Sequence, residues 1–349
     1  MNSLGRLATV IAARCLLALV TILASACNAP DTGILRPELA FTISGEGGLT
    51  AARDFTIDRA GNVFIFDYGD YVIRKFDAGG AQLLAFGGTG EEPGLFQHLM
   101  AIQVEGDSLF ALDAGSVSVF DLAGEFRSRR SFLDTVVCDL PRVHSDGRLA
   151  GEWIVQETAE KVLTSRNADG MELDRLESFD LGEFFPGVEP GETFWINPTQ
   201  VRSYLYDFDA RGRLVWAVSD RLKVFASEQG SQRLLYDTPA TAIPYPEEDV
   251  AALETRQAAV GAPFFMNVPT DFQIIHHLVV DETGAIWLYV KSQEHTGFLR
   301  LSAAGDVTGS YRVESEFDIM EARVAVANGR LYFLDGAREE VKVFVVDLP

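Results

Sequence analysis

The most constraining feature of this sequence is a motif that occurs six times, each time with a glycine in a tight turn between two short apolar segments. The gaps between successive turn glycines are 45, 41, 65, 72 and 45 residues. A repeat of about 40 to 50 residues with four strands per unit is typical of a β-propeller. The sequence therefore predicts an all-β, six-bladed β-propeller with four-stranded antiparallel blades. The turn glycines are Gly61, Gly106, Gly147, Gly212, Gly284 and Gly329.

The last repeat contains only three predicted strands. It covers residues 323–348, and the chain stops at Pro349. Residues 39–43 precede the first full repeat and have a strand-like pattern without inner strands of their own. We expect this N-terminal strand to complete the last blade, because such a closure removes exposed sheet edges.

The two longest gaps indicate insertions. Residues 246–260 begin with Pro246 and three acids and contain no glycine, which predicts one short helical insertion between blades four and five. Residues 184–201 contain three prolines and one tryptophan and are predicted to form an ordered loop between blades three and four. Both insertions precede an inner strand. We therefore expect them to cover the face of the disk at which the inner strands begin.

Residues 1–27 are typical of a lipoprotein-type signal peptide. Two arginines and no acid accompany a short apolar segment, and small residues then precede Cys27. This arrangement is similar to the bacterial lipobox. The similarity implies cleavage before Cys27, lipidation of that residue, and a protein secreted across the inner membrane and anchored by lipid in the bacterial cell envelope. The alternatives are cleavage after Ala26 without lipidation and an uncleaved anchor over residues 7–26, which the charge of Arg14 in its middle makes costly. Residues 28–38 are assigned to a tether and residues 39–349 to the propeller.

Charge and cysteine content restrict the possible partners. The net charge is −22, and without the leader the chain carries 27 basic and 51 acidic residues, or −24. Such a surface repels phosphate backbones, so we expect no nucleic-acid partner. Beyond Cys27 only Cys138 remains, so no disulfide within the domain is expected. We expect a monomer.

Residues 58–96 read DRAGNVFIFDYGDYVIRKFDAGGAQLLAFGGTGEEPGLF. This stretch closely resembles the NHL repeat in its Asp-turn-Gly, its aromatic-Asp at the end of the second strand and its Arg-x-Phe-Asp third strand. Residues 39–349 as a whole resemble the bacterial six-bladed propellers built from such repeats. The functions of that family are diverse, so the resemblance does not assign one.

The repeated aspartates are interpreted as structural. The sequence contains no phosphate-binding loop, serine-hydrolase elbow, zinc-protease motif or Cys-x-x-Cys pair. An Asp beside a tight turn usually accepts hydrogen bonds from the N–H groups of the turn. This interpretation applies to strand-ending aspartates and to aspartates that precede the first turn, namely Asp67, Asp113 and Asp335, and Asp58, Asp209 and Asp281.

Basic and imidazole groups recur in the segments that lead into the inner strands, on an otherwise acidic chain. These segments converge on the central channel, where such a ring could hold a small anionic ligand or a metal. Pairing with nearby acids, which would plug the channel, is the other interpretation. The candidate binding residues are Arg53, His98, Arg142, Arg202, Tyr204, His276 and His277.

Two functions follow from these observations. The absence of a catalytic motif favours a non-enzymatic binding protein tethered at the envelope, with an unknown protein partner or small ligand and no predicted cofactor. The alternative is a metal-dependent lyase or hydrolase of the NHL-propeller type. Resemblance to peptidylglycine amidating lyases implies a divalent metal held by histidines from separate blades, but only His98 and the adjacent His276 and His277 are well placed. Lactonase-like propellers hold calcium with acidic and amide groups, and no asparagine here occupies an inner strand. A mainly structural role in an envelope complex remains a third possibility.

Overall fold

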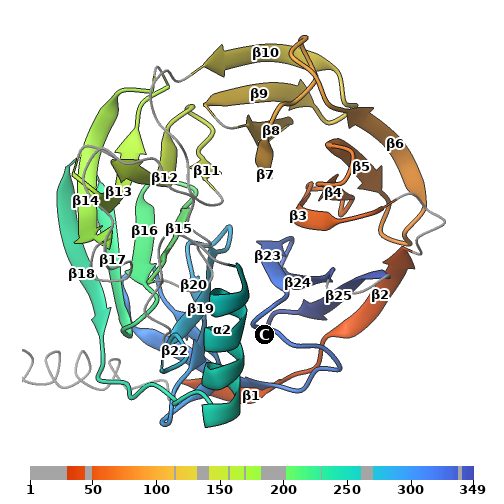
Figure 1. The fold of residues 1–349 in the computed structure, drawn as a ribbon. Helices are drawn as coiled ribbons and strands as arrows, with labels where there is room; N and C mark the ends of the chain where they lie inside the picture. The colour runs from red at the N-terminus through yellow and green to blue at the C-terminus, as the bar shows by residue number, and fades with distance from the viewer. Residues whose placement is uncertain are drawn as a thin grey trace, which may run out of the picture.

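The computed structural model describes residues 30–43, 49–113, 115–131, 141–155, 158–168, 170–181, 202–228, 230–260, 270–336 and 340–349. Six β-sheets radiate from a central channel (Figure 1), five with four strands and one with five. The predicted six-bladed β-propeller is confirmed. Within each blade, consecutive strands pair antiparallel.

The first three blades follow one another along the chain. From the channel outward, blade one contains β3 (Ala52–Ile57), β4 (Val63–Asp67), β5 (Val72–Phe76) and β6 (Gln82–Gly87). Blade two contains β7 (Leu99–Glu105), β8 (Ser108–Asp113), β9 (Ser116–Asp121) and β10 (Phe126–Ser131). Blade three contains β11 (Arg142–Val143), β12 (Leu149–Val155), β13 (Glu160–Arg166) and β14 (Glu172–Asp180).

The last three blades include both N-terminal strands. Blade four contains β15 (Tyr204–Phe208), β16 (Leu214–Val218), β17 (Lys223–Glu228) and β18 (Ser231–Asp237). Blade five contains β19 (Ile275–Val280), β20 (Ile286–Lys291), β21 (Thr296–Leu301), β22 (Val307–Val313) and β1 (Asp31–Leu35). Blade six contains β23 (Arg323–Ala327), β24 (Arg330–Asp335), β25 (Val341–Asp347) and β2 (Glu38–Ile43).

The hydrophobic core lies between neighbouring blades. The second strand of a blade is covered on both faces, and every residue of β4 (VFIFD) and β16 (LVWAV) is buried. Such strands need β-branched and aromatic side chains at each position, because no side faces water. Trp153, Trp216 and Trp287 lie on the second strands of blades three to five and are at most 1% exposed.

The ring closes as the sequence predicts. Strand β2 pairs antiparallel with β25, with Ile43 opposite Val341. The Phe41 side chain of β2 also packs against Phe76 of blade one, with ring centroids 6.3 Å apart. The N-terminal strand therefore completes blade six and joins it to blade one.

Strand β1 extends the propeller beyond its expected boundary. Residues 31–35 were assigned to the tether, but they pair parallel with β22 as a fifth strand of blade five. Only Leu35 of this strand is buried, and the Tyr311 hydroxyl lies 3.2 Å from the Asp31 carboxylate. The exposed residues in DTGIL give little of the alternating pattern by which a strand is recognised from sequence.

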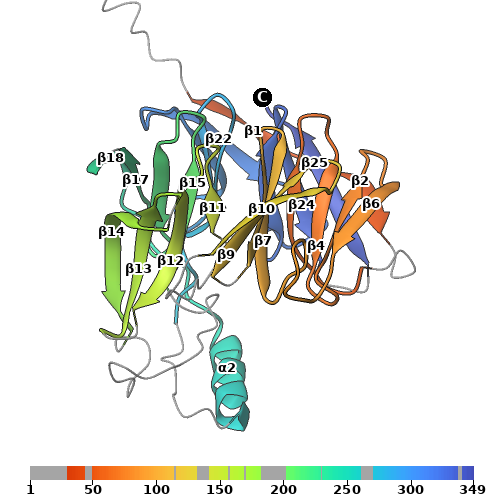
Figure 2. The ribbon, with the colours of Figure 1, turned by 90° about the horizontal axis from the view of Figure 1, so that it is seen from above.

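The helical insertion between blades four and five is also confirmed. Helix α2 (Glu247–Val260) has three acids in its first turn, where the helix dipole favours negative charge. The inner strands begin at one face of the disk, here named the insertion face, and their hairpin turns lie at the opposite face, named the turn face. Figure 2 shows α2 on one side of the disk, and β1 and the C-terminus on the other.

Two sequence predictions lie outside the described residues. The proline-containing insertion at residues 184–201 and the leader that ends at Cys27 both fall there. Within the described ranges, no helix is long and apolar enough to cross a membrane.

Candidate functional site

A cavity of about 260 Å³ occupies the central channel. It is lined by β3, β7, β15, β19 and β23, and by Arg142 at the start of β11. Alternate residues of a strand point to opposite faces, so each inner strand brings only some of its side chains to this space. Five of the six blades supply most of the lining, and blade three contributes through Arg142.

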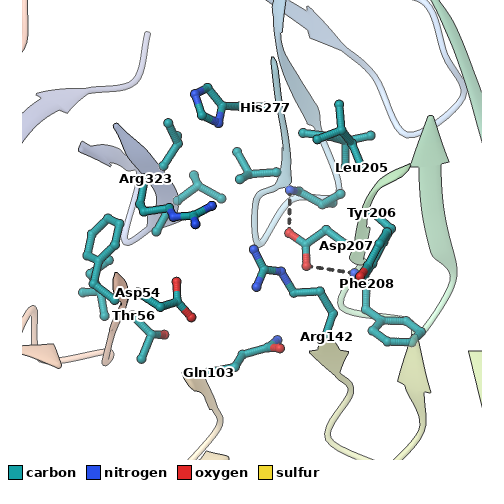
Figure 3. Close-up of a pocket in the computed structure, with 18 of the residues that line it drawn as sticks. Asp54, Thr56, Gln103, Arg142, Leu205, Tyr206, Asp207, Phe208, His277 and Arg323 are labelled. Carbon is teal, nitrogen blue, oxygen red and sulfur yellow. Dashed lines mark hydrogen bonds between the residues drawn. The ribbon is translucent and has the colours of Figure 1, made fainter. Parts of the chain in front are cut away.

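Four of the charged residues that line the cavity are labelled in Figure 3: Asp54, Arg142, Asp207 and Arg323. Burial raises the pKa of the Asp54 carboxyl, and the charges of Arg142 and Arg323 oppose this rise. Burial also raises the pKa of Asp207, again opposed by Arg142. Arg142 therefore lies within electrostatic reach of both carboxyl groups.

The two carboxylates accept hydrogen bonds from backbone. Asp54 Oδ2 accepts from the Ile102 N–H of the next blade at 2.9 Å. Asp207 Oδ2 accepts from the Val280 N–H at 3.0 Å, and Oδ1 from its neighbour Phe208 at 2.9 Å. An inner strand is the edge of its sheet, and its unpaired N–H groups need acceptors. These aspartates thus join successive blades around the channel.

The side-chain oxygens of Thr56 and Gln103 also join successive blades. Thr56 Oγ1 accepts from Val104 N–H at 3.0 Å, and Gln103 Oε1 accepts from Val143 N–H at 2.8 Å. The polar residues inside these otherwise apolar strands are therefore largely explained by contacts between blades. A residue that binds a ligand must have a polar group that these contacts between blades do not use.

The guanidinium groups of Arg142 and Arg323 have N–H donors that the contacts between blades do not use. Arg323 donates from Nε to the Arg53 carbonyl at 3.2 Å, but neither of its Nη atoms has a hydrogen bond within the described part of the chain. The Arg142 guanidinium has no hydrogen bond or ion pair with any described residue, and Figure 3 shows it pointing into the cavity between Asp54 and Asp207. Planar guanidinium groups with free N–H donors are suited to binding carboxylate or phosphate.

The two adjacent histidines are neutral at pH 7. Burial lowers the pKa of His277 to about 3 and that of His276 to about 4. His277 Nε2 lies 2.6 Å from the Ile319 carbonyl, which accepts its hydrogen. His276 Nε2 is buried and finds no hydrogen-bond partner among the described residues. The imidazoles therefore add polar surface but no positive charge.

The depressed pKa of His277 makes stability depend on pH. The unfolded chain takes up a proton near pH 6.5, but the folded chain does so only near pH 3, so stability falls as the pH falls below 6.5. By pH 5 the loss from this residue is about 2 kcal/mol. We expect urea unfolding of the wild type to show this loss relative to His277→Gln, when each is compared at pH 7 and pH 5. An equal change in both proteins would contradict the expectation.

The structure brings together four of the seven predicted ring residues. Arg142, Tyr204, His276 and His277 line the cavity. The other three lie outside its lining. Arg202 forms an ion pair with Asp220 at 2.6 Å. This contact agrees with the interpretation that the ring residues pair with nearby acids.

Arg53 and His98 lie away from the channel for a geometric reason. Arg53 is stacked over Tyr68, with its guanidinium 5.2 Å from the ring centroid. The His98 side chain is exposed, and its backbone N–H donates to Asp113. Residues just before an inner strand, or on its outward-facing positions, point to the disk face or the neighbouring sheet rather than to the channel.

Four charged residues that line the cavity, Asp54, Glu105, Asp207 and Arg323, are not among the binding residues predicted from the sequence. Asp207 and Arg323 each belong to an otherwise apolar inner strand, YLYDF and RVAVA respectively. A charge at a channel-facing position of an apolar strand was the available signal. This signal is weak, because a charge in a strand is normally expected at the surface.

The interpretation of the repeated aspartates is supported where contacts are described. Asp67 accepts hydrogen bonds from the N–H groups of Thr50, Ala51 and Gly69 at 2.8 to 3.0 Å. Aspartates before the first turn accept from the turn itself, as Asp58 does from the N–H groups of residues 60 and 62. These carboxylates hold loops in place.

The described residues provide no group of three or more His, Cys, Asp or Glu side chains that could hold a metal ion. Asp54, Asp207 and the two histidines share the cavity, but they are not gathered into such a group.

Comparison with solved structures shows the same fold. A DUF4221 family member from Bacteroides vulgatus matches with a TM-score of 0.51 at 10% identity, over 89% of this chain and 97% of that chain. A Bacteroides fragilis protein, provisionally described as exported, matches with a TM-score of 0.50 at 12% identity, over 89% and 94%. A virginiamycin B lyase from Staphylococcus aureus matches with a TM-score of 0.46 at 12% identity, over 90% and 100%. No protein-family model and no curated protein matches the sequence. At these identities the similarity concerns the fold alone.

Proposed function

We propose that this protein is a non-enzymatic binding protein of the bacterial cell envelope that takes a small polar ligand into its central channel. The observation that carries the proposal is the Arg142 guanidinium, which faces an open cavity without a hydrogen bond or ion pair to any described residue. An unpaired guanidinium that lines a cavity is available to an anionic or polar ligand. Cavities that bind small molecules typically combine apolar walls with a few such polar groups.

The proposed anchor is lipid on Cys27. Asp31 follows Cys27 by four residues, which can span at most about 14 Å when fully extended. Strand β1 runs parallel to β22 and therefore begins at the turn face. A lipid on Cys27 would place the turn face near the membrane, and the insertion face with α2 would point away from it (Figure 2).

The anchor has a direct test. We expect the wild type to partition with membranes and Cys27→Ser to be released into the soluble fraction, because the substitution removes the thiol that the lipid would modify. Cell fractionation with immunodetection measures the distribution. An unchanged membrane fraction for the variant would contradict lipidation at this residue.

The channel site is tested by ligand-induced stabilisation. A library of small metabolites is screened by thermal unfolding against the wild type and against Arg142→Gln. A ligand that binds only the folded state raises its melting temperature. We expect compounds that stabilise the wild type to lose this effect in the variant. Arg127→Gln removes an exposed guanidinium from β10 and serves as the matched control. Ligands that stabilise all three proteins equally would place binding outside the channel.

The metal-dependent lyase or hydrolase remains the alternative hypothesis, but no specific observation favours it. Its sharpest test is metal analysis of the purified protein. Stoichiometric zinc or calcium that is lost on His276→Ala would favour the alternative over the binding protein.

A further inference from the structure

We infer that the channel ligand carries an anionic group, a carboxylate or a phosphate, that Arg142 and Arg323 bind between them. The inference rests on the proposed channel site and names the chemistry of its ligand. It follows from three features of the cavity: the free donors of the two arginines, the backbone hydrogen bonds that the two aspartates accept, and the volume.

The two arginines supply donors that the protein leaves unused. The Nη atoms of Arg323 and the whole Arg142 guanidinium lack hydrogen-bond partners among the described residues. An anionic oxygen pair would accept the parallel N–H bonds of a guanidinium, and such charge-assisted bonds are among the strongest in proteins.

The two aspartates do not fill this role. Asp54 and Asp207 face the same cavity, yet neither forms an ion pair with either arginine within the described part of the chain. Their oxygens accept backbone N–H groups of Ile102, Phe208 and Val280 instead. They hold successive blades together.

The balance of charge in the cavity also favours an anion over a cation. Burial raises the pKa of Asp54 and of Asp207, and it raises the pKa of Glu105, which lines the same cavity. Burial thus opposes negative charge on each acid, whereas a guanidinium is the side-chain group that is least readily deprotonated.

The volume limits the size of the ligand. The cavity volume is about 260 Å³. This space fits a short organic acid or a phosphate ion better than a polymer. Succinate and inorganic phosphate are therefore suitable probes, because they separate a carboxylate site from a phosphate site.

The test is isothermal titration of the full-length protein at pH 7 in a low-salt buffer free of carboxylates and phosphate. Succinate and inorganic phosphate are compared with butane-1,4-diol and putrescine, which have similar length but are neutral and cationic. We expect at least one anion to bind. Arg142→Gln should weaken this binding about tenfold to a hundredfold, because it removes hydrogen bonds to a charged group. Arg127→Gln on the outer strand should leave it unchanged.

A second variant makes the test independent of folding defects. Asp54→Asn keeps a side-chain oxygen for the Ile102 N–H but removes the negative charge beside the arginines. We expect it to bind the anion several-fold more tightly than the wild type. A general disturbance of the channel would weaken binding instead.

The outcomes separate the inference from the proposed function. If neither anion binds at tens of millimolar, or if Arg142→Gln binds them as the wild type does, the inference is wrong. If butane-1,4-diol or putrescine binds in an Arg142-dependent manner and the anions do not, the channel site stands and the anionic chemistry is overturned. If library compounds stabilise the protein independently of Arg142, the channel site fails as well.

Discussion

Replacing Lys161 by methionine is expected to lower the free energy of unfolding by about 3–5 kcal/mol. This is the cost typical of removing one partner of a buried ion pair. Lys161 on β13 pairs with Glu152 on β12, and the two residues are 1% and 0% exposed. The methionine fills a similar volume but leaves the Glu152 carboxylate without its cation in a dry interior. Chemical denaturation at pH 7 measures the difference.

The pair is important because blade three has a very short inner strand. Strand β11 contains only two residues, and Glu152 of the second strand accepts the Tyr204 N–H at the start of blade four. The Glu152 backbone N–H donates to the hydroxyl of Tyr206, which lies on β15 together with Tyr204. Glu152 thus makes the kind of contact between blades that Asp54 and Asp207 make elsewhere, and Lys161 stabilises its charge.

Two controls sharpen this prediction. Lys223→Met removes the partner of Asp237 in a pair whose side chains are 41% and 40% exposed, and it should cost less than about 1 kcal/mol. The double variant Lys161→Met with Glu152→Gln should recover most of the loss, because it removes the unpaired charge and keeps an acceptor for Tyr204. A cost below 1 kcal/mol for Lys161→Met alone would show that the pair is not desolvated.

Removing strand β2 is expected to have an effect of similar size. A chain that begins at residue 44 lacks Phe41 and Ile43, which are 7% and 5% exposed. Each such side chain contributes about 1.5–3 kcal/mol by burial, so we expect this chain to be about 3–6 kcal/mol less stable than one that begins at residue 37. The open edge of β25 should also promote association between chains.

Strand β1 provides the matched comparison. The chain that begins at residue 37 retains β2 but lacks β1, whose only buried side chain is Leu35. It should lose about 1.5–3 kcal/mol relative to a chain that begins at residue 28. Denaturation curves and size-exclusion chromatography measure both effects. Equal stability of the chains that begin at residues 37 and 44 would contradict the closure of blade six by β2.

The blades were predictable because their signals are local. A turn glycine between two apolar segments specifies a hairpin, and six such hairpins at similar spacing specify a ring. The acids at the start of α2 specified that helix in the same way. Strand β1 could not be recognised, because its pairing with β22 joins residues nearly 280 apart, such as Asp31 and Gly309, and four of its five residues are exposed.

The candidate site was less predictable, because it depends on which side chains turn inward. Arg142 and the two histidines were found as basic or imidazole groups near the inner strands, but Arg53 and Arg202 satisfied the same criterion and point elsewhere. The buried pair of Lys161 and Glu152 was not foreseen either. Charged residues in a strand are normally expected at the surface, and nothing local marks the exception.

The most direct test of the central claim is a crystal structure of the protein soaked in selenate, whose anomalous scattering locates an anion without ambiguity. The account predicts a peak in the central channel within hydrogen-bond distance of both the Arg142 and the Arg323 guanidinium groups. A channel without a peak, in crystals that bind selenate elsewhere, would contradict it. So would a metal ion held by Asp54 and Asp207.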